Sequence, residues 1–455
     1  MMKIKTEILK LLVTDFSGNL PEYNISFDSR TISKGDLFIA LNGENFKAAK
    51  FVSKAFIAGA SYAVVNSGDK DLVEKKYLDK CFFVEDTTVF IKKLSTLSLD
   101  SWRQAEKVVI GITGSNGKTS TKELLVYMLN NLNIGNVRGT EGNLNNHIGV
   151  PMSVFKLNKS DQIAVFEIGT NNFGEIKYLS EIIKPDASII TCIGQSHLES
   201  FGNEEAVYKE KIDLFYETLD QSSLQKCCFF HSKDKYLGKF DNKDRCFISG
   251  DLSSGLEVRT ISNDSVEFAL GNATYNFNFN HLFGQHHYLN FLNCFSLILK
   301  TFEVEAEKIL ASAQDFKLGA FRGEWKLVNE FNCFLDCYNS NPSSLRASID
   351  SFIGKYPEKV QDTLFVIGDM YELGDLSDKY HEEAGAYFRE LALENVVFIG
   401  ERAKPFEKGF RKGIKHFKKV EDVTASQLEL GNISTLYLKG SRGVQLEKLL
   451  KIFNK

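Results

Sequence analysis

The chain has 455 residues, of which 43% are hydrophobic and 25% are charged, and its formal net charge is −4. This composition is that of an ordinary globular protein and argues against disorder, and so small a net charge argues against a broad electrostatic surface for nucleic acid or an anionic membrane. A chain of this length exceeds a single hydrophobic core, so we expect about three domains.

The cysteines and the amino terminus indicate the compartment. Eight cysteines are scattered along the chain with no C-x-x-C pair and no Cys/His cluster at zinc spacing, which favours buried free thiols in a reducing environment. The first ten residues lack the apolar stretch of a signal peptide, and no apolar run reaches the length of a spanning helix. We therefore expect a cytoplasmic monomer with no nucleic-acid partner and no stable membrane insertion.

The amino-terminal part has the pattern of a small α/β unit. Short apolar strands are predicted at residues 37–41, 63–65 and 81–84, and apolar residues recur at helical spacing through residues 51–59. We assign residues 1–85 to this first domain.

The central part begins with a polar, helical stretch at about residues 86–106. A buried strand at residues 107–112 then runs directly into a glycine loop, and a helix with an apolar face from residue 124 to residue 132 follows. Further strands are predicted at residues 163–166 and 188–193. We assign residues 86–317 to a P-loop ATPase-like domain with a parallel sheet.

From about residue 319, short strand runs alternate with helical segments. The predicted strands are residues 333–335, 364–367, 396–399 and 436–438. Such alternation is typical of a doubly wound, mostly parallel sheet, so residues 318–455 are predicted to form a Rossmann-like domain. The predicted fold class is α/β with three domains.

The glycine loop has the residues of a phosphate-binding site. Gly114 and Gly117 allow backbone N–H groups to approach phosphate oxygens, Lys118 offsets their charge, and the Thr119 hydroxyl can bind magnesium. Ile112 stands where the strict Walker pattern has a glycine, so the loop is a variant. The loop predicts nucleotide binding and leaves hydrolysis, phosphoryl transfer and ligation open.

Polar side chains follow two further predicted strands. Glu167 ends one strand and His197 follows another, and the carboxyl ends of parallel strands meet at the ligand-binding edge of such a sheet. Each residue alone is better explained as an ordinary loop side chain. Together they indicate a magnesium site, because magnesium is held by few protein ligands and several waters.

Three other motifs are ambiguous by themselves. Residues 339–344 form a turn that also suits helix capping, and residues 439–443 place two cations after a strand, where they suit either an anionic ligand or solvent. Arg30, after Asp28 and Ser29, is open to the same two interpretations.

Taken together, these segments resemble the Mur ligases, which build the peptide stem of bacterial cell-wall precursors, and the resemblance spans nearly the whole chain. The matching segments are Asp28-Ser29-Arg30 with residues 35–40, residues 113–119, residues 167–171, residues 197–202 with Lys211, and residues 284–290. Residues 336–342, 368–374 and 439–443 look like the member that adds D-alanyl-D-alanine, and the Asn-Pro-Arg element of the sister that adds the third stem residue is missing.

The resemblance implies that the acceptor is UDP-N-acetylmuramoyl-tripeptide, that the incoming amine is D-alanyl-D-alanine, and that an acyl phosphate forms with ATP and one or two Mg²⁺ ions. It implies carbamylation of Lys211. The implied catalytic residues are Lys118, His197 and Lys211. The implied ATP-binding residues are Gly114, Ser115, Asn116, Gly117, Lys118, Thr119, Asn290, Arg322, Asp336 and Asn339. The implied metal ligands are Thr119, Glu167, His197 and Lys211, and the implied substrate-binding residues are Ser29, Arg30, Asn143, Lys439 and Arg442.

The sequence departs from the family pattern in two places. One is residues 46–49, and the other is His287, which stands where asparagine is usual. Two other functions stay open. A folylpolyglutamate-type amide ligase would share the central domain but gives no reason for Asp28-Ser29-Arg30, and a non-catalytic nucleotide-sugar-binding homologue would not need Lys118, Glu167 or His197.

Overall fold

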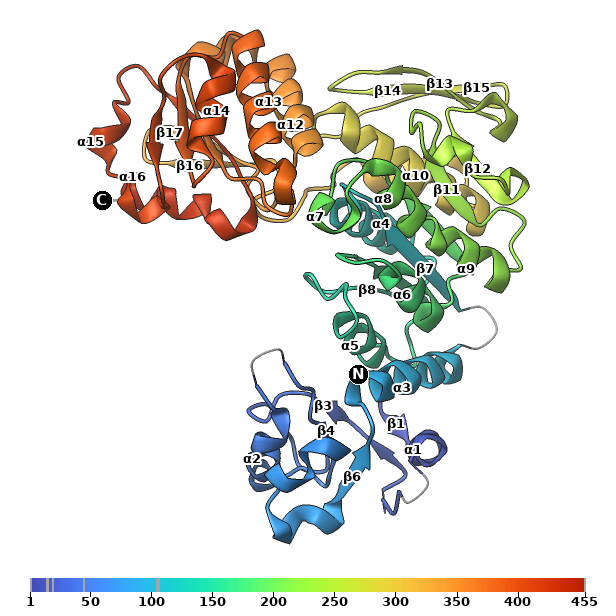
Figure 1. Cartoon of the computed structure of the whole chain (residues 1–455). Helices are drawn as coiled ribbons and strands as arrows, with labels where there is room; N and C mark the ends of the chain where they lie inside the picture. The colour runs from blue at the N-terminus through green and yellow to red at the C-terminus, as the bar shows by residue number, and fades with distance from the viewer. Residues whose placement is uncertain (1, 14–15, 19, 44–45, 104–106, 454–455) are drawn as a thin grey trace.

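The computed structural model describes residues 2–13, 16–18, 20–43, 46–103 and 107–453. Three regions each contain their own parallel or mostly parallel sheet, and Figure 1 shows the amino-terminal and carboxy-terminal regions attached to different parts of the central one. The α/β fold class is confirmed. Of the described residues, no helix is both long and apolar enough to cross a bilayer.

The amino-terminal region holds a four-stranded parallel sheet in the order β3-β4-β5-β6. Its strands are β3 (Ile25–Ser26), β4 (Leu37–Ile39), β5 (Tyr62–Asn66) and β6 (Cys81–Val84). The three predicted strands are therefore present, and the predicted helix appears as a 3-10 turn, η1 (Ala48–Phe51), followed by α2 (Val52–Ala58). A two-stranded antiparallel sheet of β1 (Ile4–Lys5) and β2 (Glu22–Tyr23), together with α1 (Thr6–Leu12), completes this region.

Helix α3 (Thr87–Trp102) joins the first two regions. Its first residues are capped by the Asp86 carboxylate, which accepts hydrogen bonds from the backbone of Thr88 and Val89. Phe90, Ile91 and Leu94 pack in the amino-terminal core, whereas Leu99 and Trp102 pack in the central core. One helix thus contributes to both cores, because its apolar face is long enough to reach across the junction.

The central sheet has six parallel strands in the order β12-β11-β10-β7-β9-β8. They are β7 (Val108–Thr113), β8 (Val137–Gly139), β9 (Ile163–Glu167), β10 (Ala187–Ile190), β11 (Cys228–His231) and β12 (Cys246–Ser249). β7 lies between β9 and β10, so the loop that follows it opens at the point where the strand order reverses, which is where ligands bind in such sheets.

Strand β10 ends three residues earlier than the apolar run 188–193 predicts. The Thr191 hydroxyl donates to the Asn116 carbonyl at 2.5 Å, and the Ser115 backbone N–H donates to the Cys192 carbonyl at 2.8 Å. These residues leave the sheet because they bind the neighbouring glycine loop.

Helices cover both faces of the central sheet. One face carries α4 (Lys118–Asn131), α10 (Gln285–Thr301) and α11 (Ala306–Ala313), and the other carries α6 (Glu175–Ile183), α8 (Glu204–Lys211) and α9 (Asp213–Gln221). A small antiparallel sheet of β13 (Leu256–Ile261), β14 (Val266–Leu270) and β15 (Ala273–Phe277) packs on α10 through an aromatic cluster. We predicted no strands at these residues.

The carboxy-terminal sheet has the order β16-β17-β21-β18-β19-β20, and only its edge strand β16 is antiparallel. The strands are β16 (Glu324–Val328), β17 (Phe331–Leu335), β18 (Thr363–Gly368), β19 (Val396–Ile399), β20 (Lys415–Phe417) and β21 (Thr435–Lys439). The helices between them are α12 (Pro342–Lys355), α13 (Ser377–Glu390) and α14 (Ala403–Phe410) (Figure 1). The predicted doubly wound sheet is therefore present.

Candidate active site

The glycine loop joins β7 to α4 in a conformation that requires glycine at two positions. Gly114 has φ +149°, and a Cβ there would collide with the Thr191 hydroxyl. Gly117 has φ +77°, and a Cβ there would lie 2.9 Å from the Asn290 amide. Positive φ and close approach together exclude other residues, so the loop can turn tightly over the start of α4 and present its backbone N–H groups.

Lys118 begins α4 and is half-buried beside this loop. Its ammonium donates to the Gly114 carbonyl at 2.8 Å, and burial is the main cause that lowers its pKa. A cation held by one neutral carbonyl in a partly dehydrated site is well placed to accept an anionic ligand instead.

Glu167 lies at the end of β9 and is only 1% exposed. Its Oε1 accepts a hydrogen bond from the Thr119 hydroxyl at 3.1 Å and another from the Asn145 amide at 2.9 Å. Its Oε2 is buried without a hydrogen-bond partner among the described residues. A buried, unsatisfied carboxylate oxygen next to a threonine hydroxyl fits a cation, because burial without a partner is otherwise costly.

Lys211 lies at the end of α8, is fully buried, and its Nζ has no hydrogen-bond partner among the described residues. Burial, together with repulsion from Lys118, lowers its pKa to about 7. A lysine with no counter-charge is unusual in a protein interior, since a buried charge is normally paired. The side chain therefore fits a group that is completed by something other than the polypeptide.

The residues with an expected metal role fit a magnesium site with few protein ligands. Within the described ranges no three His, Cys, Asp or Glu side chains gather in a cluster that could hold a metal. The Thr119 hydroxyl and the free oxygen of Glu167 lie together and would hold magnesium there, with water in the remaining positions.

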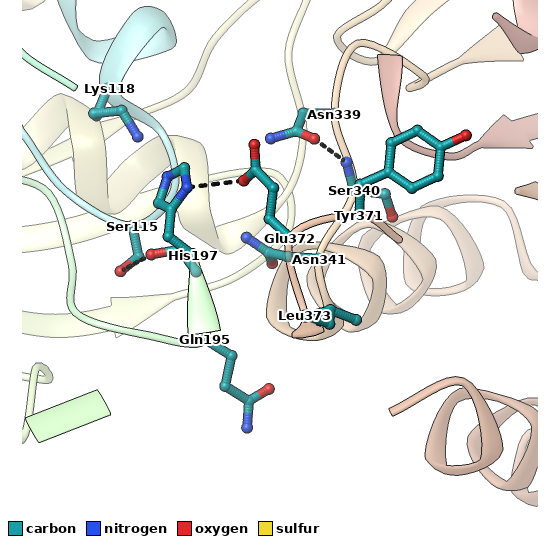
Figure 2. Close-up of a pocket in the computed structure, with 11 residues that line it drawn as sticks. Ser115, Lys118, Gln195, His197, Asn339, Ser340, Asn341, Tyr371, Glu372 and Leu373 are labelled. Atoms are coloured by element: carbon teal, nitrogen blue, oxygen red, sulfur yellow. Dashed lines mark hydrogen bonds and ion pairs between the residues drawn. The ribbon is translucent and has the colours of Figure 1, made fainter. Parts of the chain in front are cut away.

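A pocket between the central and carboxy-terminal regions brings predicted residues from both together (Figure 2). Its walls are Ser115, Lys118, Gln195, Ser196, His197, Asn339, Ser340, Asn341, Tyr371, Glu372 and Leu373. Asn116 connects the two sides through its side chain. Its Nδ2 donates to the Ser343 hydroxyl at 2.8 Å, and its Oδ1 accepts from the Asn341 amide at 2.7 Å. Asn341 also caps α12, so the start of that helix is fixed against the glycine loop.

A second, larger cavity of about 240 Å³ opens beside the first. Thr119 and Glu123 from α4 line it, together with Arg322, Tyr338 and Arg442 from the carboxy-terminal region. The Arg322 guanidinium lies 3.7 Å from the centre of the Tyr338 ring, and that of Arg442 pairs with Glu447 at 2.8 Å. Two arginines in the lining of the cavity that Thr119 also lines make it suitable for an anionic group.

Lys439 is engaged inside the carboxy-terminal region. It is 3% exposed, lies 3.0 Å from the Asp336 carboxylate, and donates to the Asn339 carbonyl at 2.8 Å. Asp336 follows β17 and Lys439 ends β21, so the ion pair ties two neighbouring strand ends together and sets the position of Asn339 in the pocket. In this structure the charge of Lys439 is already paired.

Asn290 lies on α10, 8% exposed, directly beside Gly117. The preceding turn carries His286 and His287, whose ring centres are 4.0 Å apart, and burial lowers the pKa of His286 to about 4. The expected adenine contact at Asn290 thus lies next to the glycine loop, and the departure at His287 lies three residues earlier on the same helix.

The other expected substrate residues lie elsewhere. Ser29 and Arg30 lie in the amino-terminal region and line neither described pocket, and Arg30 is 87% exposed on its side chain and paired with Asp28 at 2.7 Å. Asn143 is exposed in the loop after β8, next to Gly142, which lines the second cavity.

Three polar residues of the site were not anticipated: Glu372, Asn341 and Asn145. Each follows a strand, β18, β17 and β8 respectively, and strand ends were the signal used for Glu167 and His197. Glu372 and Asn341 belong to motifs that the sequence analysis had matched as a whole, but nothing in the sequence shows that they face the central region.

Comparison with known proteins identifies the family. The Mur ligase middle domain matches residues 112–298, and the Mur ligase glutamate ligase domain matches residues 322–442. A UDP-N-acetylmuramoyl-tripeptide--D-alanyl-D-alanine ligase of a Synechocystis strain is 30% identical over 393 residues, covering 86% of this chain and 82% of the relative. The chain belongs to the Mur ligase family.

Two more similarities cover essentially the full length of this Mur ligase. A UDP-N-acetylmuramoyl-tripeptide--D-alanyl-D-alanine ligase from Bacillus subtilis is 29% identical over 442 residues, covering 94% of this chain and 92% of the relative. A crystal structure of MurF from Acinetobacter baumannii superposes with a TM-score of 0.87 at 25% identity, and each chain is covered completely. The whole three-region architecture, including the region before the matched domains, is therefore shared with these relatives.

Proposed function

We propose that this Mur ligase joins D-alanyl-D-alanine to UDP-N-acetylmuramoyl-tripeptide, with ATP converted to ADP and phosphate, as a cytoplasmic enzyme of peptidoglycan synthesis. The substrates are those for which the full-length relatives are named. We also propose that it acts as three domains, residues 1–85, 86–317 and 318–455, which hold the nucleotide sugar, ATP and the incoming dipeptide respectively.

The observation that carries the ligase function is the buried Lys211, whose Nζ has no hydrogen-bond partner among the described residues and whose pKa is lowered further by the charge of Lys118. A plain phosphate-binding loop needs no second buried lysine. With its pKa lowered to about 7, a large part of Lys211 is neutral at physiological pH, and a neutral amine reacts with carbon dioxide to form a carbamate. The carbamate would present an anionic head to magnesium, together with Thr119, Glu167 and His197.

The reaction needs an activated acid, because a carboxylate with an oxide leaving group does not react usefully with an amine. The terminal carboxylate of the tripeptide attacks the γ-phosphate of ATP, so that an acyl phosphate forms and ADP leaves. The neutral amine of the dipeptide then attacks the acyl carbon, and phosphate leaves from the tetrahedral adduct as the amide forms. Bound magnesium would neutralise the approaching anions.

The residues of this chain act mainly by position and charge. Lys118 moves from the Gly114 carbonyl to the phosphates, and Arg322 approaches them from the second cavity. Asn290 contacts the adenine, while Asp336 and Asn339 complete the nucleotide site from the carboxy-terminal side. Closure of the two regions over the pocket excludes water from the acyl phosphate.

Substrate recognition is divided among three loops. Ser29 and Arg30 would contact the nucleotide sugar, Asn143 the stem peptide, and Arg442 the carboxylate of the dipeptide, with Lys439 acting through its pairing with Asp336. A folylpolyglutamate-type activity is less well supported, since the amino-terminal sheet and its Asp28-Ser29-Arg30 turn then have no role.

The deciding assay mixes the protein with ATP, Mg²⁺, UDP-N-acetylmuramoyl-tripeptide and D-alanyl-D-alanine, and follows phosphate release and pentapeptide formation. We expect phosphate release to require both the tripeptide and the dipeptide. Tripeptides that differ in their third residue, and a folate substrate with glutamate, are run in parallel. Phosphate release that ignores the dipeptide, or product only from the folate, would refute the proposed function.

A further inference from the structure

A short helix of the central region docks into the carboxy-terminal core. Leu198, in α7 (Leu198–Phe201), is 4% exposed and packs with Met370 and Leu373, which belong to the turn after β18. The Glu199 backbone N–H donates to the Glu372 carbonyl at 3.3 Å, and a Cβ on Gly374 would lie 3.0 Å from the Glu199 Cα. The two segments are therefore in direct backbone contact across the boundary between the regions.

The turn that carries Glu372 is held from its own side as well. The buried His381 ring accepts a hydrogen bond from the Met370 backbone at 3.0 Å and bonds the Ser377 carbonyl at 2.7 Å, so it fixes both ends of the turn. The Ser441 hydroxyl accepts from the Tyr371 backbone at 3.0 Å. Glu372 itself has φ +64°, a conformation that costs free energy for a residue with a side chain and persists where its surroundings impose it.

Glu372 and His197 face each other from these two segments. The His197 Nδ1 lies 2.8 Å from the Glu372 Oε2, and His197 also has a positive φ of 51°. A glutamate side chain is ordinarily ionised at neutral pH, so the Oε2 atom in this 2.8 Å contact is a carboxylate oxygen. An ionised carboxylate can only accept hydrogen bonds, and the proton of the bond must therefore be on His197 Nδ1.

We propose that Glu372 is a positioning residue that fixes His197 as the Nδ1–H tautomer and leaves its Nε2 lone pair free for the reaction centre. Figure 2 shows the His197 ring turned toward Glu372, with Lys118 on the same side of the pocket as His197. Metal-binding histidines commonly donate their other ring N–H to a carboxylate, which orients the ring and makes the ligand more basic. Here that carboxylate comes from a different region of the chain than the histidine.

Because Glu372 and His197 come from different regions, the tautomer of His197 depends on whether the two regions are docked. The expected magnesium ligands Thr119, Glu167, His197 and Lys211 all lie in the central region, but His197 has its Nδ1 partner only when the 370–376 turn is docked on α7. An open arrangement leaves both tautomers of the ring accessible. The role in catalysis rests on the proposed function, whereas the tautomer itself does not.

The test reads the ring nitrogens directly, in the full chain labelled with ¹⁵N-histidine and free of metal and nucleotide. The His197 signals are assigned from their loss in His197→Asn. We expect a protonated Nδ1 and an unprotonated Nε2 in the unsubstituted protein, and a shift toward the mixture typical of free imidazole in Glu372→Ala. Asp375→Asn, an exposed carboxylate three residues further along the same turn, is the matched control and should leave the signals unchanged.

A kinetic arm uses the same variants. Loss of a carboxylate behind a metal-binding histidine typically costs about 10- to 100-fold in metal affinity or activity, so Glu372→Ala should require that much more Mg²⁺ for half-maximal rate while the KM for ATP changes little. Glu372→Gln keeps an acceptor without the charge and should lie between.

Unchanged ring-nitrogen signals in Glu372→Ala would overturn the proposal, as would an unchanged Mg²⁺ requirement. A thermal melt of each variant identifies misfolding, and a folded Glu372→Gln then decides the question alone. If the ring signals shift as expected but no ligase activity is found in any variant or in the parent, the proposed function fails and the positioning role stands.

Discussion

The two regions with six-stranded sheets differ in whether their buried charged side chains have bonding partners. In the central region, Lys211 at the end of α8 and one oxygen of Glu167 at the end of β9 are buried without a partner among the described residues. At the end of the carboxy-terminal sheet, Lys439 is buried just as deeply but is bound to Asp336 and to the Asn339 carbonyl. Both sheets place charge at the carboxyl ends of parallel strands, and only one leaves that charge available.

Unpaired buried charges are expected where the reaction takes place, in the central region. Paired buried charges are expected in the carboxy-terminal region, which positions side chains around that site. An unpaired buried charge costs free energy in the free protein, and ligands that supply the missing partner recover it on binding. A paired charge contributes order instead, and here it fixes the loop that carries Asn339. The carboxy-terminal region thus acts by placing side chains such as Glu372 over the chemistry of the central region.

The largest effect is expected at Lys211. Lys211→Ala should lower kcat by roughly 10²–10³-fold, because a preorganised anionic group at the reaction centre would be lost. A small added carboxylic acid should restore part of the rate by occupying the vacated space. Lys209→Ala, an exposed lysine on the same helix, is the control and should retain the parental rate. Full activity in Lys211→Ala would remove the carbamate from the mechanism.

Breaking the ion pair of Lys439 should lower the free energy of unfolding. Asp336→Ala leaves Lys439 buried with no carboxylate partner, and breaking such a pair destabilises by about 3 kcal/mol. The measurement is chemical denaturation in a Trp102→Phe background, where Trp325 on β16 reports the carboxy-terminal region. Asp378→Asn, whose pair with Arg402 is exposed, should change little. Equal effects of the two substitutions would contradict a structural role for the buried pair.

Lys211→Met should stabilise the protein at pH 7, whereas Asp336→Ala should destabilise it. Burial holds the pKa of Lys211 at about 7 in the folded chain against 10.5 for the ordinary group, so between these values the unfolded chain binds the extra proton. The parent should therefore gain stability from pH 7 toward pH 10, by at most about 1.4 kcal/mol per pH unit, and the methionine variant should not.

Thermal melts at pH 7, 8 and 9 in carbonate-free buffer measure this difference. We expect Lys211→Met to be the more stable protein at pH 7, with the advantage shrinking as the pH rises. Lys209→Met serves as the exposed control. A difference that is constant with pH would mean that Lys211 is not buried in its free state as described.

The smallest effect is expected at Arg30, whose charge is paired but exposed. Arg30→Ala should leave the melting temperature unchanged, since exposed ion pairs contribute little. If Arg30 contacts the nucleotide sugar, the KM for that substrate should rise by about tenfold, with the KM for ATP unchanged. A proportional rise in both constants would indicate general damage, and no rise in either would remove Arg30 from the substrate site.

Much of the fold was predictable because strongly apolar runs are insensitive to context. The strands around residues 63–65, 333–335 and 396–399 are all present, and the glycine loop follows β7 as expected. The sheet of β13, β14 and β15 was missed because its strands alternate exposed polar residues with a few buried aromatics and carry no extended apolar run. The predicted length of β10 was too great, because Thr191 and Cys192 bind the glycine loop.

The sequence by itself determined which residues could do chemistry here. Gly114, Lys118 and Thr119 are recognisable because phosphate binding depends on local backbone geometry and on residue types at fixed spacing. Only the tertiary structure decided which charges are free. Pairing joins residues far apart in the chain, such as Asp336 with Lys439 or His197 with Glu372, and no local pattern encodes whether a partner is present.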